Sequence, residues 1–132
     1  MKTKTINKVA LLVIKNKSLL AVYKPDIRFY ITPGGKIDKH ESDKECAKRE
    51  IYEELGCTPF NLKYFKTFKG INIDGRKIVL KCYFCKLKGK IKMNREVTEH
   101  VWINSTNKNN LPIAPLLRSR IFVELKTKEL IK

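Results

Sequence analysis

Three glutamates, Glu50, Glu53 and Glu54, are the side chains of this sequence whose type and spacing suit chemistry. At about 100° per residue in a helix, they gather on one face within roughly 100° of arc. Like charges this close repel each other, so their clustering calls for a compensating cation. Carboxylate oxygens on a rigid helix suit Mg²⁺ or Mn²⁺, which keep coordination positions for water and phosphate oxygens. A solvated acidic helix face is the alternative when the glutamates are considered alone.

A longer pattern surrounds these glutamates and runs from Gly35 to Cys57. It consists of Gly35, then Glu41 after five residues, and after seven more the run Arg49-Glu50-Ile51-Tyr52-Glu53-Glu54-Leu55-Gly56-Cys57. The pattern resembles the Nudix box, G-x5-E-x7-R-E-U-x-E-E-x-G-U, where U is a bulky aliphatic residue. Only the last position departs from the family pattern, because it holds a cysteine. A cysteine is a small buried hydrophobe, so this change affects packing rather than chemistry.

The resemblance implies metal-dependent hydrolysis of a nucleoside diphosphate linked to another group, such as a nucleoside triphosphate or a nucleotide sugar. The products would be a nucleoside monophosphate and a phosphorylated remainder. Divalent cations would neutralise the charge that develops on the phosphate oxygens and lower the pKa of a bound water. The implied ligands of Mg²⁺ or Mn²⁺ are Gly35, through its backbone, and the carboxylates of Glu50, Glu53 and Glu54.

Arg49 and Glu99 complete the implied catalytic set with the three glutamates. In the family the arginine usually orients a box glutamate through a charge-assisted hydrogen bond, so we expect Arg49 to support the site. Glu99, three residues before Trp102, resembles the position where many Nudix enzymes place a further carboxylate near the metals. Glu50 and Glu99 are both candidates for the general base. Alternatively, Glu99 and the nearby Glu96 only balance neighbouring lysines.

The candidates for substrate binding lie around the turn Pro33-Gly34-Gly35, whose glycines allow a ligand to approach the backbone. They are Arg28, Tyr30, Gly35 and Lys36. Phe29 or Tyr30 would stack on a nucleobase, although core packing is the stronger alternative for at least one of them. The identity of the nucleobase in the substrate stays open. Small MutT-type members of the family carry Pro-Pro-Ala-Asn before the last helix, whereas residues 112–115 here read Pro-Ile-Ala-Pro and lack the base-gripping asparagine.

The net charge of +16 is unevenly placed along the chain. The segment Gly35–Cys57 has seven acidic and five basic residues, a balance of −2, so the remainder carries +18. A basic body around an acidic metal site suits a polyanionic substrate, although a lysine-rich composition is an equally good explanation. This charge keeps two alternatives open. One is removal of pyrophosphate from RNA 5′ ends, and the other is a non-catalytic nucleic-acid-binding module, against which the intact glutamates argue.

A helix over Asp43–Leu55 is expected to position the glutamates. Ser42 and Glu45 form a capping-box pattern at its start, and Gly56 is placed to end it. Ala47, Ile51 and Leu55 form an apolar stripe on the side that packs against the rest of the protein.

The remaining apolar runs predict strands and one further helix. We expect a hairpin of Lys8–Ile14 with Ser18–Tyr23, an extended segment at Arg28–Thr32, and a hairpin of Asn61–Phe68 with Lys77–Leu87 around the turn Asp74-Gly75. A basic connection follows at Lys86–Arg95, and a helix begins near Pro115 and runs toward Leu130. Together these elements predict an α/β fold, an α/β/α sandwich with a central mixed sheet, which the Nudix resemblance also implies. Residues 1–132 form one domain on this interpretation.

The cysteine pair Cys82-x-x-Cys85 allows two interpretations. Either it belongs to a zinc site, for which no second pair is present, or it is two buried reduced thiols in a strand, which we favour. Reduced thiols indicate a cytoplasmic protein. The apolar run Val9–Ile14 is too short for a signal peptide or a membrane span. The expected partners are a nucleotide substrate and, weakly, nucleic acid, with no membrane, for a monomer or homodimer.

Overall fold

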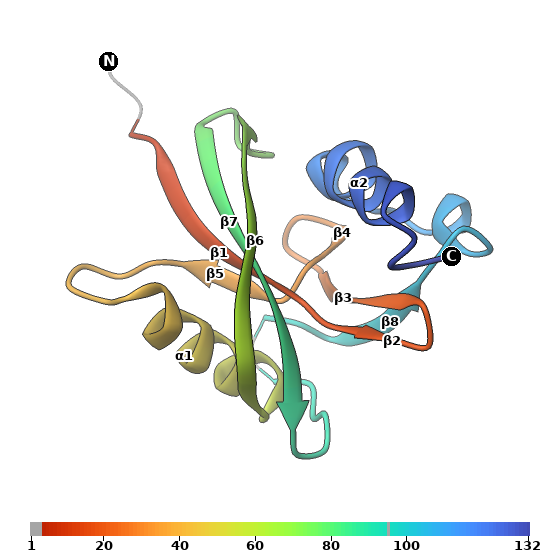
Figure 1. The fold of residues 1–132 in the computed structure, drawn as a ribbon. Coiled ribbons are helices and arrows are strands. Elements are labelled where there is room, and N and C mark those ends of the chain that lie inside the picture. The colour runs from red at the N-terminus through yellow and green to blue at the C-terminus, as the bar shows by residue number, and fades with distance from the viewer. Residues whose placement is uncertain (1–3, 95) are drawn as a thin grey trace.

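The larger of two sheets lies at the centre of the computed structural model, which describes residues 4–94 and 96–132 (Figure 1). Its strand order is β5 (Gly34–Lys36), β1 (Ile6–Leu12), β7 (Lys77–Lys88) and β6 (Thr58–Ile71). β1 runs parallel to β7 and antiparallel to β5, while β6 and β7 are antiparallel. The sheet is therefore mixed, as the sequence predicts.

The second sheet is built on β3 (Ser18–Lys24). β3 pairs antiparallel with β8 (Glu99–Ile103) and also with β2 (Ile14–Lys15) and β4 (Phe29–Ile31). The turn between β4 and β5 connects the two sheets, because β5 belongs to the first. This connection contains Pro33 and leads directly into the glycines of the candidate site.

Helical segments cover opposite sides of the sheets (Figure 1). α1 (Asp43–Leu55) packs on one side, and a π-helical turn (Leu117–Ile121) followed by α2 (Phe122–Thr127) packs on the other. Alternate residues of β1 serve the two sides: Leu11 joins the core cluster that contains α1, and Leu12 joins the cluster that contains α2. The expected α/β/α sandwich is confirmed.

The predicted bounds of α1 are correct at both ends. The Oγ of Ser42 accepts a hydrogen bond from the Glu45 amide at 3.1 Å, and the Glu45 carboxylate accepts one from the Ser42 amide at 2.9 Å. Gly56 follows in the left-handed conformation, with φ 67°. Both signals are local in sequence, so no tertiary information was needed to place this helix.

The expected hairpin between Lys8–Ile14 and Ser18–Tyr23 is wrong for most of its length. β1 lies between β5 and β7 in the first sheet, and only the two-residue strand β2 pairs with β3. The physical reason is that β1 is apolar on both faces and fills the interior of the larger sheet. The second predicted hairpin is confirmed, since β6 and β7 pair antiparallel around Asp74-Gly75.

The C-terminal helix begins near Pro115, as predicted, and ends before Leu130. A short 3-10 helix (Lys108–Asn110) precedes it, and α2 ends at Thr127. Glu129 has a positive φ of 59°, which helical continuation does not allow. None of the helices in the described part of the chain is long and apolar enough to cross a membrane.

The two cysteines of the Cys-x-x-Cys pair point to opposite sides of β7. Cys82 belongs to the core cluster that contains α2, and Cys85 belongs to the cluster that contains α1. Residues three apart in a strand face opposite ways, so this pair does not form one half of a zinc site. Both are buried free thiols, like Cys46 and Cys57, and burial raises the pKa of Cys82 and Cys85 to about 12.

Candidate functional site

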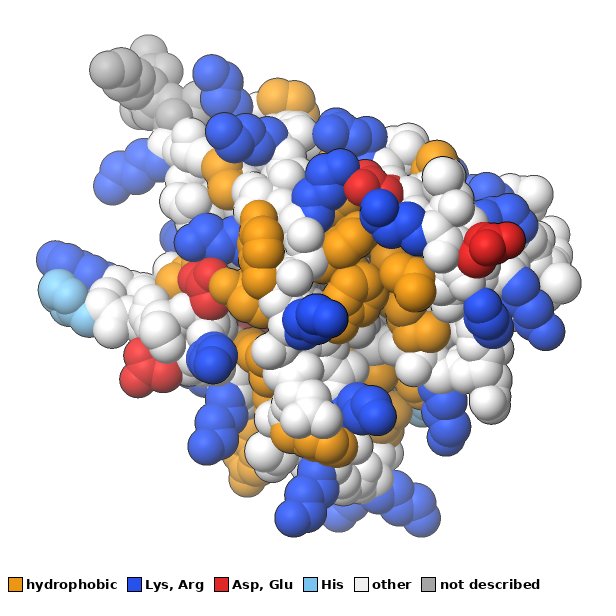
Figure 2. Space-filling model, viewed as in Figure 1, with side chains coloured by type: hydrophobic (Ala, Val, Ile, Leu, Met, Phe, Trp, Pro, Cys, Tyr) orange, Lys and Arg blue, Asp and Glu red, His pale blue; other side chains and the backbone are white. Residues whose placement is uncertain are grey.

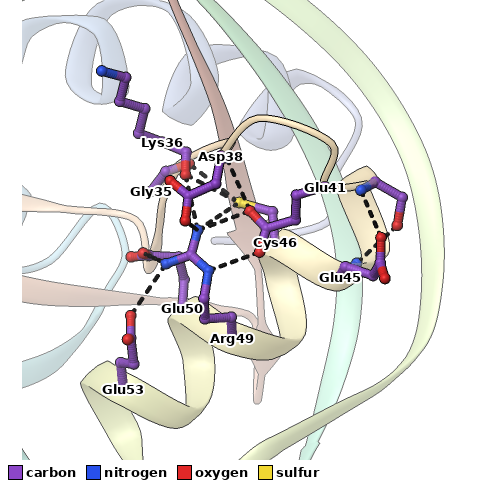
Figure 3. Close-up of polar contacts among 10 residues, drawn as sticks. Gly35, Lys36, Asp38, Glu41, Glu45, Cys46, Arg49, Glu50 and Glu53 are labelled. Atoms are coloured by element: carbon purple, nitrogen blue, oxygen red, sulfur yellow. Dashed lines mark hydrogen bonds and ion pairs between the residues drawn. The ribbon is translucent and has the colours of Figure 1, made fainter.

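α1 presents its glutamates to the glycine turn that begins β5 (Figure 3). Ala47, Ile51 and Leu55 are fully buried, with 0% of their surface exposed, so they dock the helix onto the sheets. Packing of this stripe turns the adjoining glutamate face toward the backbone of Gly34 and Gly35. The core therefore sets the position of the site.

Glu54 is buried, with 8% of its surface exposed, and it accepts a hydrogen bond from the Gly34 amide at 3.1 Å. Desolvation raises the pKa of Glu54 to about 8, against the lowering effect of that hydrogen bond. Gly34 has φ 135°, and a Cβ there would lie 2.0 Å from the Val9 carbonyl oxygen. A side chain at this position is therefore excluded, and sequence analysis did not include Gly34 among the site candidates although the Pro-Gly-Gly run was a signal for it.

Gly35 lies directly against the carboxylate of Glu50. A Cβ on Gly35 would lie 2.2 Å from Oε2 and 2.5 Å from Cδ of Glu50. Only a residue without a side chain leaves room for this contact. Burial raises the pKa of Glu50, while hydrogen bonds from Arg49 oppose that rise. Gly35 and Glu50 are therefore in close contact, and the role of the Gly35 backbone as a metal ligand stays a prediction.

Arg49 is held by a two-pronged ion pair with Glu41, the second position of the Gly35–Cys57 pattern (Figure 3). Its Nε donates to Glu41 at 2.7 Å and its Nη2 donates at 2.8 Å. These hydrogen bonds lower the pKa of Glu41 to about 2 and raise the pKa of Arg49. Planar fork geometry of this kind fixes the guanidinium orientation, which a lysine would not achieve.

The remaining nitrogen of Arg49 reaches the glutamates of the proposed metal site. Nη1 donates to Glu50 at 2.6 Å and to Glu53 at 3.2 Å, while Nη2 donates to the Lys36 carbonyl at 3.1 Å. Asp38, which sequence analysis did not single out, adds an ion pair with Nη2 at 3.3 Å. Arg49 therefore orients two glutamates rather than one.

The donor set suits a divalent cation by its chemistry. Hard carboxylate oxygens of Glu50, Glu53 and Glu54 are the ligands that Mg²⁺ and Mn²⁺ prefer. Glu54 has no ion-pair partner among the described residues, so a cation beside it would offset the cost of burying its charge. Over residues 4–94 and 96–132, however, no three His, Cys, Asp or Glu side chains lie close enough together to hold a metal ion. Glu50 and Glu53 instead direct oxygens to Arg49.

Lys24, at the end of β3, lies on the same side of the molecule as the glutamates. Burial raises the pKa of both Glu50 and Glu54, and the positive charge of Lys24 opposes part of that rise. The Nζ of Lys24 forms an ion pair with Glu96 at 3.4 Å. Glu96 in turn raises the pKa of Glu54. No local sequence pattern marks Lys24, because long-range strand packing brings it to the site.

Glu99 lies beside two tyrosines rather than beside Arg49. It is paired across the sheet with Tyr23, which pairs with Tyr30 on its other side, and Glu99 raises the pKa of Tyr30 after the larger effect of burial. Tyr30 is 8% exposed, belongs to the core cluster of α2, and packs its ring 5.0 Å from that of Tyr23. Arg28 and Lys36 are both exposed, Arg28 in the turn before β4 and Lys36 at the end of β5.

Comparison with solved structures shows where this fold occurs. The E. coli ORF135 protein is 24% identical, with a TM-score of 0.75 over 95% of this chain and 93% of that one. A MutT Nudix hydrolase from Burkholderia pseudomallei is 19% identical, with a TM-score of 0.77 over 92% and 98%. A UDP-X diphosphatase is 18% identical, with a TM-score of 0.77 over 97% and 64%. A search of curated proteins found no match.

The family model for the NUDIX domain matches residues 5–115 of this chain. This range contains the glycine turn, all of α1 and Lys24. It also contains Glu96, which precedes β8, and Glu99, the first residue of β8. Members of the family generally use divalent metal ions and bind nucleotide substrates. The chain therefore belongs to the Nudix family and is a hydrolase that acts on pyrophosphate bonds.

Proposed function

We propose that this protein is a metal-dependent pyrophosphohydrolase that cleaves a nucleoside diphosphate linked to another moiety. The observation that carries the proposal is the fit of Glu50 against Gly35 and of Glu54 against the Gly34 amide, with Arg49 orienting Glu50 and Glu53. A solvated acidic helix face would need neither glycine nor a buried carboxylate. Mg²⁺ or Mn²⁺ is the proposed cofactor, and the buried free thiols support a cytoplasmic location.

A divalent ion held by Glu50, Glu53, Glu54 and the backbone of Gly35 would neutralise phosphate charge and supply a water of lowered pKa. The chain's own groups do the positioning. Arg49, itself clamped by Glu41, holds the carboxylates of Glu50 and Glu53 in place.

Proton transfer is assigned to Glu50. Its carboxylate is desolvated and its pKa is raised, which makes it a better proton acceptor near neutral pH than a surface glutamate. Glu99, the other candidate, lies beside Tyr23 and Tyr30. Lys24 supplies positive charge beside Glu50 and Glu54, where an anionic substrate would approach.

The test is release of nucleoside monophosphate from a panel of nucleoside triphosphates and nucleotide sugars in the presence of Mg²⁺ or Mn²⁺. Both classes are included because similar folds occur in a MutT hydrolase and in a UDP-X diphosphatase. Glu53→Gln keeps the side-chain shape and removes a ligand charge, so turnover should fall by several orders of magnitude. Glu129→Gln, the same change at an exposed site near the C-terminus, is the matched control. Equal turnover in the two variants would show that Glu53 is not a metal ligand.

Removal of pyrophosphate from RNA 5′ ends is the second candidate. The observation that favours it is the +18 charge carried outside the segment Gly35–Cys57. A 5′-triphosphorylated oligonucleotide in the same panel separates this candidate from hydrolysis of free nucleotides.

A further inference from the structure

A cavity of about 580 Å³ lies beside the ends of β7 and β8, and among the described residues no glutamate lines it. Its walls come from the segment at the end of β1, from the end of β7 and the connection after it, and from β8. The lining residues Trp102 and His100 pair with Leu20 and Val22 of β3, four and two residues of strand from Lys24, or about 13 and 7 Å. Among the described residues, none of the proposed metal-site residues lines the cavity, so the two sites are distinct. Trp102 packs against the core cluster that contains α1, so the cavity and the glutamates lie on the same side of the second sheet.

Four basic side chains line this cavity, and all four are exposed: Lys15, Lys86, Lys90 and His100. No acidic side chain lines the cavity, and among the described residues no carboxylate forms an ion pair with any of these four. In Figure 2, the lower end of the molecule, where β7 ends in Figure 1, shows Lys and Arg side chains and no Asp or Glu. Uncompensated positive charge around a hollow attracts an anion.

The lining of the cavity also contains apolar side chains, among them one aromatic ring. Trp102 is half-buried, so part of its surface is open, and Ile91 is another of the apolar lining residues. An open aromatic surface between basic side chains is the arrangement with which proteins hold a base by stacking and its phosphates by charge. The cavity volume falls in the range of pockets that enclose one nucleotide-sized ligand.

We propose that this cavity binds one nucleotide residue of a single-stranded nucleic acid, with the base on Trp102 and the flanking phosphates on Lys15, Lys86 and Lys90. A strand is favoured over a free mononucleotide because the basic side chains continue past the cavity. Lys88, the last residue of β7, and Lys92, in the connection after it, are both exposed. A strand has a phosphate on each side of the bound base, which matches charge on more than one side of the cavity. The proposal goes beyond the proposed hydrolysis and does not rest on it.

Trp102 supplies a direct readout, because it is the only tryptophan of the sequence. Its fluorescence is followed while a single-stranded oligonucleotide is added in EDTA, so that no turnover occurs. Stacking should quench the fluorescence saturably. A mononucleotide of the same base is the second arm, and it should bind at least tenfold more weakly at equal salt. Equal affinity of the two ligands, or no quenching by the oligonucleotide, would overturn the proposal.

Charge variants test the basic rim. Lys86→Ala with Lys90→Ala should weaken oligonucleotide binding and reduce the slope of log affinity against log salt by about 1.4, since each lost contact to a single strand contributes about 0.7. The matched control is Lys69→Ala with Lys77→Ala, which removes the same charge from exposed positions at the opposite end of the β6–β7 hairpin. Identical slopes in the two double variants would contradict the assignment.

The ring itself is tested with a fluorescently labelled oligonucleotide, measured by anisotropy. Trp102→Phe keeps an aromatic surface, and Trp102→Leu replaces it with an aliphatic side chain of a size similar to Phe. The Leu variant should therefore bind the oligonucleotide roughly tenfold more weakly than the Phe variant. Circular dichroism and thermal unfolding of both variants confirm that they are folded. Equal affinity of the two folded variants would exclude stacking on this ring.

Discussion

Glu54 is a buried carboxyl without a cationic side chain paired to it in the described residues, which ties its proton to the stability of the metal-free protein. Its pKa is raised from 4.5 to about 8, so the folded state binds a proton more tightly than the unfolded state. The free energy of unfolding in EDTA should therefore fall as pH rises from 4.5 to 8, by at most about 1.4 kcal/mol per pH unit from this group. Urea unfolding at a series of pH values measures this slope.

Glu54→Gln is the comparison for that slope, because an amide fills the same space and does not titrate. The variant should lose less stability than the wild type as pH rises through this window. The pKa of Glu41 is lowered to about 2, so its contribution is present above pH 4.5 and is lost only at lower pH. The titration of Glu41 therefore does not affect the comparison between pH 4.5 and 8. Parallel slopes for wild type and variant would show that Glu54 titrates as a surface carboxylate.

Changing Gly34 to alanine should mainly lower stability, whereas changing Gly35 to alanine should mainly lower turnover. At Gly34 the added Cβ meets backbone, the Val9 carbonyl oxygen at 2.0 Å, and φ is 135°, so the unfolding free energy should drop by about 3 kcal/mol. At Gly35 the three atoms nearest to the added Cβ all belong to the Glu50 side chain, which is flexible and rotates away at little cost in stability. Moving that carboxylate should lower turnover roughly a hundredfold. Thermal unfolding and single-turnover kinetics on both variants separate the two effects. Full activity of the Gly35→Ala protein would show that the position of Glu50 is not needed for catalysis.

At the scale of the element, α1 was predictable because its determinants are close in sequence. Ser42 and Glu45 cap its start, Gly56 ends it, and the stripe of Ala47, Ile51 and Leu55 gives its buried side. β1 was predictable as a strand but not as a member of the first sheet. Its neighbours, β5 and β7, are far along the chain, and the short run after Leu12 suggests a hairpin when only local pattern is considered.

Long-range strand pairing also explains which site residues were missed. Lys24 reaches the glutamates only because β3 and α1 share one core cluster, and nothing near Lys24 in the sequence marks it. Glu99 was singled out by its spacing to Trp102, and the register of β8 on β3 places it opposite Tyr23, the residue before Lys24. Its catalytic role stays a prediction, because the partners of a strand are set by distant parts of the chain.

The cap of α1 should contribute to stability without taking part in chemistry. Ser42→Ala removes the hydrogen bond from the Glu45 amide, which should lower the free energy of unfolding by about 1 kcal/mol. Turnover per folded molecule should change little, because the glutamates stay anchored by the buried stripe. Urea unfolding and active-site titration provide the two measurements. Ser42→Thr, which retains the hydroxyl acceptor, serves as the control, and equal loss of stability in Thr and Ala variants would show that the cap is not the cause.

At the scale of the whole molecule, charge is divided between an acidic site and a basic body, and the two should act on different steps. The segment Gly35–Cys57 carries −2 and the rest of the chain +18. Charges on the surface attract a polyanion across water and are screened within about 8 Å at physiological salt. Groups that contact the reacting phosphates act in a partly dehydrated site, where screening is weak.

Raising the ionic strength from a low value to about 0.5 M should therefore lower kcat/KM severalfold and leave the single-turnover chemical rate nearly unchanged. In the proposed mechanism, association with the substrate uses the basic body. The chemical step depends on Glu50 and Glu53, which Arg49 holds, and on Glu54, which the Gly34 amide holds. Glu54→Gln should show the opposite behaviour, a loss of several orders of magnitude in the chemical rate that salt does not alter. Both proteins are compared on one confirmed substrate at saturating metal. A chemical rate that falls with salt as steeply as kcat/KM would mean that the basic body stabilises the transition state, and that the division of labour between site and body is incorrect.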